Sequence, residues 1–227
     1  MLWQKIRSGV KTMSTPTLDE LAVALATRLR PDPFDTHFAL QLVRLLANGQ
    51  PVSPDQIASA LQVTRDEAST ALRERCPDAE LDAAGNVIGF GLTMTPTPHR
   101  FQIDGHTLFT WCALDTLFYP VWLKQTARVE SACPITRVPI KLVVTPEAVE
   151  AFEPTSAVMS FVIPETAEAC CAVRSAFCNH VHFFSSSETA AVWLAERPDA
   201  IALPIEDAYR LGHLLLHQRL KKATKKE

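Results

Sequence analysis

An α+β fold is predicted for this chain of 227 residues: a winged-helix-like helical module at the N-terminus, then a mixed or antiparallel β-sheet core with flanking helices. Three observations lead to this expectation. Helix-capping signals dominate residues 36–95. From residue 96 onward, short strands and helices follow one another without regular β–α–β alternation. The hydrophobic content of 47% also suffices for a sizeable core.

Helix start and stop signals define the N-terminal module. Residues 1–35 are interpreted as an extension with one helix, because residues 18–30 repeat apolar side chains at helical spacing. Three helices and a β-ribbon then fill residues 36–95. The boundaries of these elements are marked by a glycine after the first helix, N-cap residues before the second and third helices, and a glycine at the turn of the ribbon. These residues are Gly49, Ser53, Thr64 and Gly85. Three helices followed by a ribbon are typical of a winged helix.

Winged helices often bind DNA, and the net charge of this module indicates whether DNA binding or a structural role is the better interpretation. Residues 36–100 contain five arginines and no lysine against seven carboxylates, a net charge of −2. The third helix begins Arg65-Asp66-Glu67, which places two carboxylates where phosphates or base edges should lie. A structural module that binds no nucleic acid is therefore the favoured interpretation.

The core module is expected to span residues 96–212, followed by a helix end and lysine-rich tail at 213–227. A hairpin with an Asp104-Gly105 turn is predicted first. The further elements are predicted from the spacing of apolar residues and from the proline, glycine and polar residues that separate the segments. The expected helical segments are 112–118 (ending before Pro120), 146–152, 165–177, 187–198 and 205–220, and the expected strands are 127–133, 140–145, 156–163 and 178–184.

Composition excludes several classes of protein. The net charge of −3 and pI near 6.2 argue against a dedicated binder of nucleic acid or anionic membranes. No stretch approaches the ~20 apolar residues of a membrane helix, and no glycine-rich phosphate-binding motif occurs. Six cysteines at irregular spacing, without a secretory signal, indicate reduced thiols and a cytoplasmic protein.

The first candidate site is the segment LFTWCALDTLFYP, residues 108–120, which holds Cys112 and Asp115. With Thr110 as N-cap, Cys112 would lie in the first turn of a helix, where backbone N–H groups and the helix dipole favour a thiolate. Asp115, three residues on, would share its face with the Cβ atoms about 5–6 Å apart. In apolar surroundings this acid should tend to keep its proton. The spacing alone is also compatible with an ordinary core cysteine.

The second candidate is FCNHVHFF, residues 177–184. If this segment is a strand, Cys178, His180 and His182 share one face and suggest a zinc site. Neighbouring same-face residues converge poorly on one tetrahedral ion, and zinc-type C-x-x-C spacing is absent. Core or pocket histidines are therefore favoured, and the role of Cys178 stays open on this evidence.

The segments FTWCALDTLF and SAFCNHVHFF, with LLANGQPVS, DAAGNVIGFGLTM, TARVESACPITRVPIKLVVTPEAVEAFEP and AVMSFVIP in order, resemble the bacterial organomercurial (alkylmercury) lyase family. The resemblance covers roughly residues 36–212. It implies a paired set of active-site cysteines at Cys112 and Cys178, with Asp115 as the acid, all three contacting mercury. Asn179 stands where some members carry a further cysteine.

The resemblance implies protonolytic cleavage of a carbon–mercury bond, giving a hydrocarbon and Hg(II), for mercury detoxification. Thiolates would bind the soft metal, and Asp115 would carry a proton to the departing carbon. No cofactor is implied beyond Hg(II) held as product. The implied partners are the organomercury substrate, small cytosolic thiols that release the product, and mercuric reductase as acceptor. Cys133 would be structural.

An alternative function is a winged-helix regulator that senses thiophilic metals through its cysteines. Residues 36–95 favour it, and the negative charge of that segment speaks against it.

Overall fold

The computed structural model describes residues 17–28, 33–162 and 173–224 of the chain. The predicted extension is represented by α1 (Leu18–Arg28), which matches the helical periodicity of that segment. Most of the helix expected over residues 165–177, with Cys170 and Cys171, lies outside the described residues.

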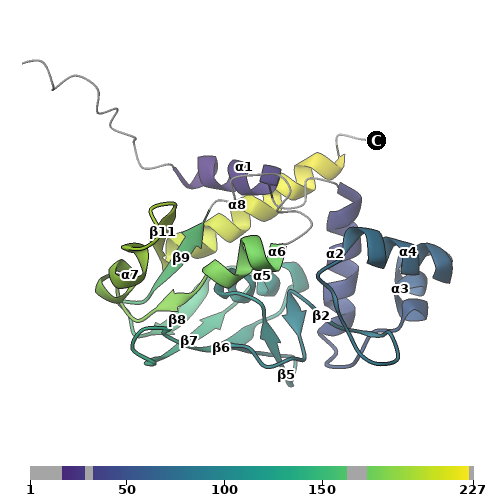
Figure 1. The fold of residues 1–227 in the computed structure, drawn as a ribbon, viewed down its shortest axis with the longest axis horizontal. Helices are drawn as coiled ribbons and strands as arrows, with labels where there is room; N and C mark the ends of the chain where they lie inside the picture. The colour runs from purple at the N-terminus through teal and green to yellow at the C-terminus, as the bar shows by residue number, and fades with distance from the viewer. Residues whose placement is uncertain (1–16, 29–32, 163–172, 225–227) are drawn as a thin grey trace, which may run out of the picture.

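The N-terminal module has the predicted three helices and ribbon (Figure 1). Its elements are α2 (Pro33–Leu46), α3 (Pro54–Leu61), α4 (Arg65–Arg75), β1 (Glu80–Leu81) and β2 (Val87–Phe90). The Ser53 and Thr64 hydroxyl oxygens accept hydrogen bonds from the N–H groups of Gln56 and Glu67. Both predicted N-caps are therefore confirmed, and they satisfy N–H groups that a helix start leaves without partners.

One antiparallel sheet of eight strands, in the order β1-β2-β3-β5-β4-β6-β7-β8, forms the centre of the described chain. Its other strands are β3 (Leu92–Thr93), β4 (His99–Ile103), β5 (His106–Thr110), β6 (Ala127–Ala132), β7 (Pro139–Val144) and β8 (Val149–Glu153). The ribbon of the N-terminal module belongs to this sheet, because β3 pairs with both β2 and β5. The antiparallel sheet was predicted. The division into separate domains at residue 95 stays a prediction.

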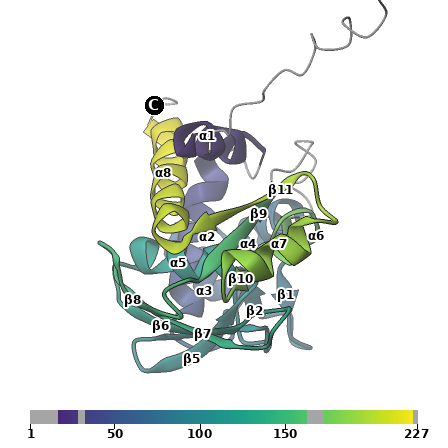
Figure 2. The same cartoon turned by 90° about the vertical axis from the view of Figure 1, so that its left-hand side faces the viewer.

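Helices cover one face of the large sheet. The central helix α5 (Ala113–Leu123) packs between the sheet and α8 (Ile205–Thr224), and α1 and α2 pack on α8. Figure 2 shows α2, α5 and α8 above the sheet. Along β6 buried and exposed residues alternate, so the opposite face points outward. Because α5 is buried on most of its surface, the residues at its start have a fixed position.

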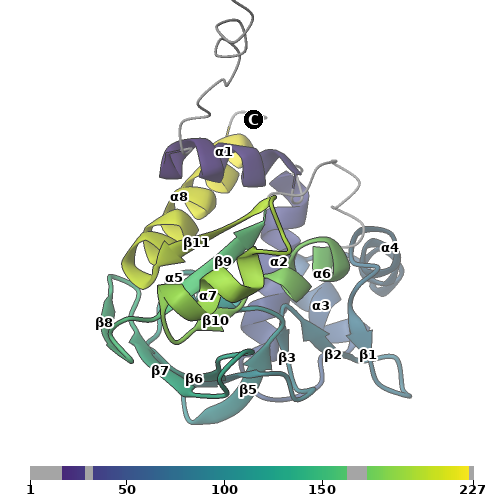
Figure 3. The ribbon, with the colours of Figure 1, turned by 60° about the vertical axis from the view of Figure 1, so that its left-hand side comes forward.

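A smaller sheet lies beside the large one and carries the second candidate segment (Figure 3). It has the order β10-β9-β11, and it is antiparallel throughout. Its elements and the helices between them are β9 (Val158–Val162), α6 (Val173–Ala176), β10 (Phe183–Phe184), α7 (Ser187–Leu194) and β11 (Ala200–Pro204). The sequence interpretation contained no strand at β11, whose alanines and proline have little strand propensity.

Two of the elements predicted for this part of the chain were wrong. The helix expected to end before Pro120 continues to Leu123, since buried aromatic residues on its last turn pack against each other and outweigh the missing proline N–H. Residues 149–153 form the edge strand β8 and no helix, because pairing with β7 overrides the helix propensity of Glu and Ala. The last helix, α8, extends past the expected segment 205–220 to Thr224.

The hairpin β4–β5 turns at Asp104 and Gly105, as predicted, with positive φ values of 47° and 78°. Two consecutive residues with positive φ are the requirement of a type I′ turn, which suits the twist of antiparallel strands. This turn returns the chain along β5 toward Thr110, directly before the first candidate site.

None of the helices in the described ranges combines the length and the apolar character that crossing a membrane requires.

A buried histidine predicts how stability changes with pH. Burial, and then the neighbouring His182, lower the pKa of His99 from 6.5 to about 3, while its Nδ1 contacts the Ser131 hydroxyl at 2.8 Å. Between pH 6.5 and 3 the unfolded chain takes up a proton that the folded protein does not accept at His99. His99 alone should therefore lower the free energy of unfolding by about 1.4 kcal/mol per pH unit as the pH drops through this window.

Urea unfolding at pH 7, 6, 5 and 4 measures this slope in the wild type and in His99→Gln. The variant should show a flatter dependence below pH 6.5, and the two proteins should run in parallel above pH 7. Equal slopes below pH 6.5 would contradict the prediction.

Candidate active site

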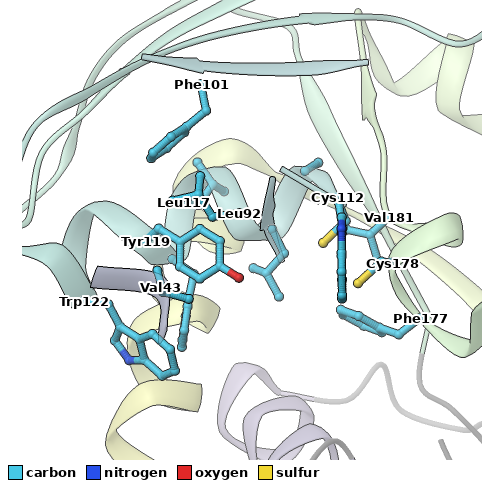
Figure 4. Packing of buried hydrophobic residues seen from close by; sticks show 14 of the residues in the cluster. Val43, Leu92, Phe101, Cys112, Leu117, Tyr119, Trp122, Phe177, Cys178 and Val181 are labelled. Carbon is cyan, nitrogen blue, oxygen red and sulfur yellow. The ribbon is translucent and has the colours of Figure 1, made fainter. Parts of the chain in front are cut away.

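Cys112, Asp115 and Cys178 form a cluster in the folded chain. One sulfur or carboxylate oxygen from each residue lies within 4.8 Å of the others. Cys112 is fully buried, Cys178 is nearly so, and Asp115 is partly exposed. In Figure 4 the sulfur atoms of Cys112 and Cys178 lie in the same part of the core, next to Val181 and Phe177. Two thiols can bind a soft metal, and the carboxylate beside them can take up or supply a proton while the metal is bound.

The start of α5 positions Cys112 and Asp115. Cys112 is the N-cap and not a first-turn residue, so the prediction that Thr110 caps the helix was wrong. Thr110 is instead the last residue of β5, and its hydroxyl donates to the Cys112 carbonyl at 2.9 Å. The Asp115 carboxylate accepts from the Cys112 backbone N–H at 3.2 Å. This hydrogen bond holds the acid beside the thiol, as the i, i+3 spacing predicted.

The second cysteine reaches the site through a tight turn. Cys178–His180 is a single 3₁₀ turn, so the strand predicted from Cys178 was wrong, and only Phe183 and Phe184 pair as β10. The Val181 carbonyl accepts from the Ala113 N–H at 3.1 Å. This bond joins the turn to the first residue of α5, next to Cys112. A straight strand would place neither the carbonyl nor Cys178 there.

Buried Ser160 on β9 fixes the same turn. Its hydroxyl donates to the His180 carbonyl and accepts from the His182 N–H, both at 2.9 Å. Sequence reasoning missed this residue. Its signal was a single hydroxyl within the otherwise apolar strand VMSFV, where a buried polar group needs partners.

The zinc hypothesis for Cys178, His180 and His182 finds no support in this geometry. Among the described residues, the grouping of metal-ligating side chains is Cys112, Asp115 and Cys178, without either histidine. The His182 ring packs against His99 and Trp193. Because the backbone turns between Cys178 and His182, these side chains do not share one face.

Burial controls the protonation of the first thiol. It raises the pKa of Cys112 well above its ordinary value of 9.0, and the neighbouring Cys178 and Asp115 act in the same direction. The expectation that the helix start favours a thiolate was therefore wrong, since desolvation outweighs the dipole at a fully buried sulfur. At neutral pH the thiol keeps its proton, and a base must accept that proton when the sulfur binds a metal.

An apolar cavity of about 80 Å³ opens next to the cluster. Asp115 and Cys178 lie on its wall, and the remaining wall is mostly aromatic and aliphatic. The wall includes residues from α2, β2, α5, α6 and α8 and from the segments just before α5 and just after α6: Ala39, Val43, Phe90, Trp111, Phe118, Tyr119, Trp122, Val173, Phe177 and Leu215. Such a cavity suits a ligand whose hydrocarbon group lies against the apolar wall while its other end faces the two sulfurs.

Comparison with known proteins identifies the family. A family model described as alkylmercury lyase matches residues 92–217. An alkylmercury lyase of Streptomyces lividans is 47% identical over 174 residues, which cover 77% of this chain and 79% of the relative. That of Pseudomonas putida is 42% identical over 202 residues, covering 89% and 93%. This chain belongs to the alkylmercury lyase family.

The N-terminal module of this alkylmercury lyase has a match of its own. A model described as the helix-turn-helix domain of alkylmercury lyase matches residues 17–91. The crystal structure of the mercury-bound form of MerB2 shares the fold, with a TM-score of 0.70 and 23% identity over 89% of this chain and 98% of that one. These findings support a lyase and not the alternative of a metal-sensing regulator.

Cys133 lies away from the cavity of the lyase, in the turn between β6 and β7. Burial raises the pKa of its thiol, but hydrogen bonds from the Thr136 hydroxyl and from nearby backbone N–H groups, including that of Ser185, outweigh burial and lower it to about 6. These bonds connect the turn to the loop before α7, which agrees with the structural role that the resemblance implied.

Gly91 lies on the wall of the cavity at a position that favours glycine. Its φ is +75°, and an added Cβ would lie 1.8 Å from the Tyr119 hydroxyl oxygen. Its carbonyl also accepts from the Trp111 N–H at 2.7 Å. Gly91→Ala should lower the free energy of unfolding by about 2–5 kcal/mol, the sum of left-handed strain and overpacking.

Gly85→Ala is the matched control for urea unfolding, because Gly85 has φ +81° and an added Cβ would meet open space there. It should lose only the strain contribution of about 1–2 kcal/mol. Equal losses in the two variants would show that the contact with Tyr119 does not matter.

Proposed function

We propose that Cys112 and Cys178 bind the mercury of an alkyl- or arylmercury substrate and that Asp115 transfers the proton that breaks its carbon–mercury bond. The observation that carries this proposal is the buried cluster of two sulfurs and one carboxylate beside an apolar cavity. The family assignment supplies the reaction, and the cluster supplies every group that the reaction needs.

The first stage is the exchange of mercury onto the two sulfurs. The substrate arrives as R–Hg–SR′, with mercury held by a small thiolate. One cysteine sulfur bonds to mercury, and its proton leaves with the small thiol as R′SH. The second sulfur then bonds to mercury, and its proton moves to the Asp115 carboxylate, which lies within 4.8 Å. Because burial keeps the Cys112 thiol protonated, this stage depends on a nearby base.

The second stage breaks the carbon–mercury bond. Two sulfur ligands donate electron density to mercury and weaken its bond to carbon. The electron pair of that bond stays on carbon, which takes the proton from Asp115. The products are R–H, an ionised Asp115 carboxylate, and Hg(II) bonded to both cysteine sulfurs. The two cysteine protons end on R–H and R′SH, so atoms and charge balance without a redox step.

Partners follow from the chemistry of the product. Hg(II) held by two sulfurs exchanges readily onto other thiolates, so small thiols would release it and a mercuric reductase would accept it. Both belong to a reducing compartment, and we infer a cytoplasmic location and a role in mercury resistance. No further cofactor enters the proposed steps.

Benzene release from a phenylmercury salt, with excess small thiol and gas chromatography as readout, tests the proposed function. The wild-type protein should release about one benzene per substrate consumed. If it binds mercury but releases no benzene over repeated additions of substrate, the proposed reaction is wrong.

A further inference from the structure

Glu80 lies on β1 of the N-terminal module, and its side chain contacts the wall of the active-site cavity at Trp111. Its carboxylate accepts from the Trp111 indole Nε1–H at 3.0 Å and forms an ion pair with the Arg174 guanidinium. The second oxygen accepts from the hydroxyls of Thr93 and Thr95, the latter at 2.8 Å. Four donors occupy the acceptor positions of one carboxylate, so the side chain has a single well-defined orientation.

The surroundings of Glu80 leave space for this orientation. Its side chain is only 15% exposed. Gly89 faces it across the β1–β2 pair, and a Cβ at Gly89 would lie 2.5 Å from the Glu80 carboxylate. Burial raises the pKa of Glu80, but the hydroxyl hydrogen bonds and the Arg174 charge outweigh it and keep the pKa below 4.5. The carboxylate is therefore ionised at neutral pH, and its four partners fix its position.

Two of its four partners, Trp111 and Arg174, belong to the segments that carry the two cysteines. Trp111 directly precedes Cys112, and its ring lines the cavity. Arg174 lies on α6, which leads through Phe177 to Cys178, and its guanidinium carbon lies 5.2 Å from the centroid of the Trp111 ring. One carboxylate thus joins both segments from outside the cluster. A part-buried ion pair adds little net stability, because desolvation offsets the attraction. Its main effect here is on geometry.

We propose that Glu80 is a positioning residue of this lyase: through Trp111 and Arg174 it sets the placement of the Cys112 and Cys178 segments relative to each other. The proposal rests on the proposed function. It assigns the ribbon of the helix-turn-helix module a role in building the active site. Glu80 is also one of the seven carboxylates that argued against DNA binding by the module. Its charge is directed into the protein, where it pairs with Arg174.

Turnover of Glu80 variants tests the proposal. Glu80→Ala should lower kcat/KM about 10–100-fold, as loss of a group supporting a metal ligand does, mainly through kcat, because the cavity wall stays in place. Glu80→Gln should recover part of the loss, since its amide oxygen still accepts from Trp111. In a Trp111→Phe background, Glu80→Ala should cost clearly less than in the wild type, because the two act through one contact. The exposed Glu74→Gln, on α4 of the same module, is the matched control and should keep wild-type kcat/KM.

A spectroscopic readout separates positioning from loss of folding. The difference in fluorescence between wild type and Trp111→Phe reports Trp111, and this emission should change in Glu80→Ala at temperatures well below its melting point. Wild-type kcat/KM in Glu80→Ala, or full additivity with Trp111→Phe, would overturn the proposal. If Glu80→Ala does not fold, the kcat/KM of Glu80→Gln, measured alone and together with Trp111→Phe, tests the proposal in its place. Should the wild type itself release no benzene, the proposed function fails, and the Trp111 emission still tests the contact.

Discussion

Replacing either Cys112 or Cys178 by alanine is expected to lower benzene release from phenylmercury by about 10³-fold or more, with the double variant losing little beyond either single one. The two sulfurs act as one unit on one mercury atom, and members of such a unit are strongly non-additive. A single remaining sulfur would bind mercury but could not activate the carbon–mercury bond with two donors. Gas chromatography of benzene with excess small thiol measures the effect.

Cys76→Ala provides the control for the loss of a buried cysteine. Cys76 is also buried, but it ends α4 and does not line the cavity. This variant should keep wild-type turnover while losing some stability from the deleted core sulfur. If Cys112→Ala released benzene as fast as the wild type, the proposed mercury ligands would be wrong.

Asp115→Asn is expected to lower kcat by about 10²–10⁴-fold, the usual contribution of a positioned proton donor. The amide retains an oxygen that can accept from the Cys112 N–H, so the start of α5 keeps its hydrogen bond. It has no proton to exchange with the thiols. Hg(II) binding should survive, because both sulfurs remain, and equilibrium dialysis followed by mercury analysis measures it.

Asp115→Ala should lose turnover to a similar degree, and Asp66→Asn is the matched control. Asp66 is an exposed aspartate in the first turn of α4, outside the cavity. Wild-type turnover in Asp115→Asn would exclude this residue as the proton carrier. In deuterium oxide the wild-type product should carry one deuterium from the exchangeable thiol and carboxyl groups.

The winged-helix-like arrangement and half of the active site were predictable from local patterns. The caps at Ser53 and Thr64, the turn at Asp104-Gly105 and the approach of Asp115 to Cys112 all involve residues at most three positions apart. Over such distances, backbone geometry leaves few alternatives. Periodicity was misleading where tertiary pairing decided the outcome, as in β8 and at Cys178.

By itself the sequence determined that a thiol and an acid share the start of one helix, and its ordered motifs pointed to the family. Only the tertiary structure decided that Cys178 faces this pair, since the bond from Ala113 to Val181 and the contacts of Ser160 join segments far apart in the chain. It also decided the raised pKa of Cys112 and the inward orientation of Glu80. Local hydrogen bonds depend on neighbouring residues, whereas burial and long-range contacts depend on how the whole chain packs, which no short pattern encodes.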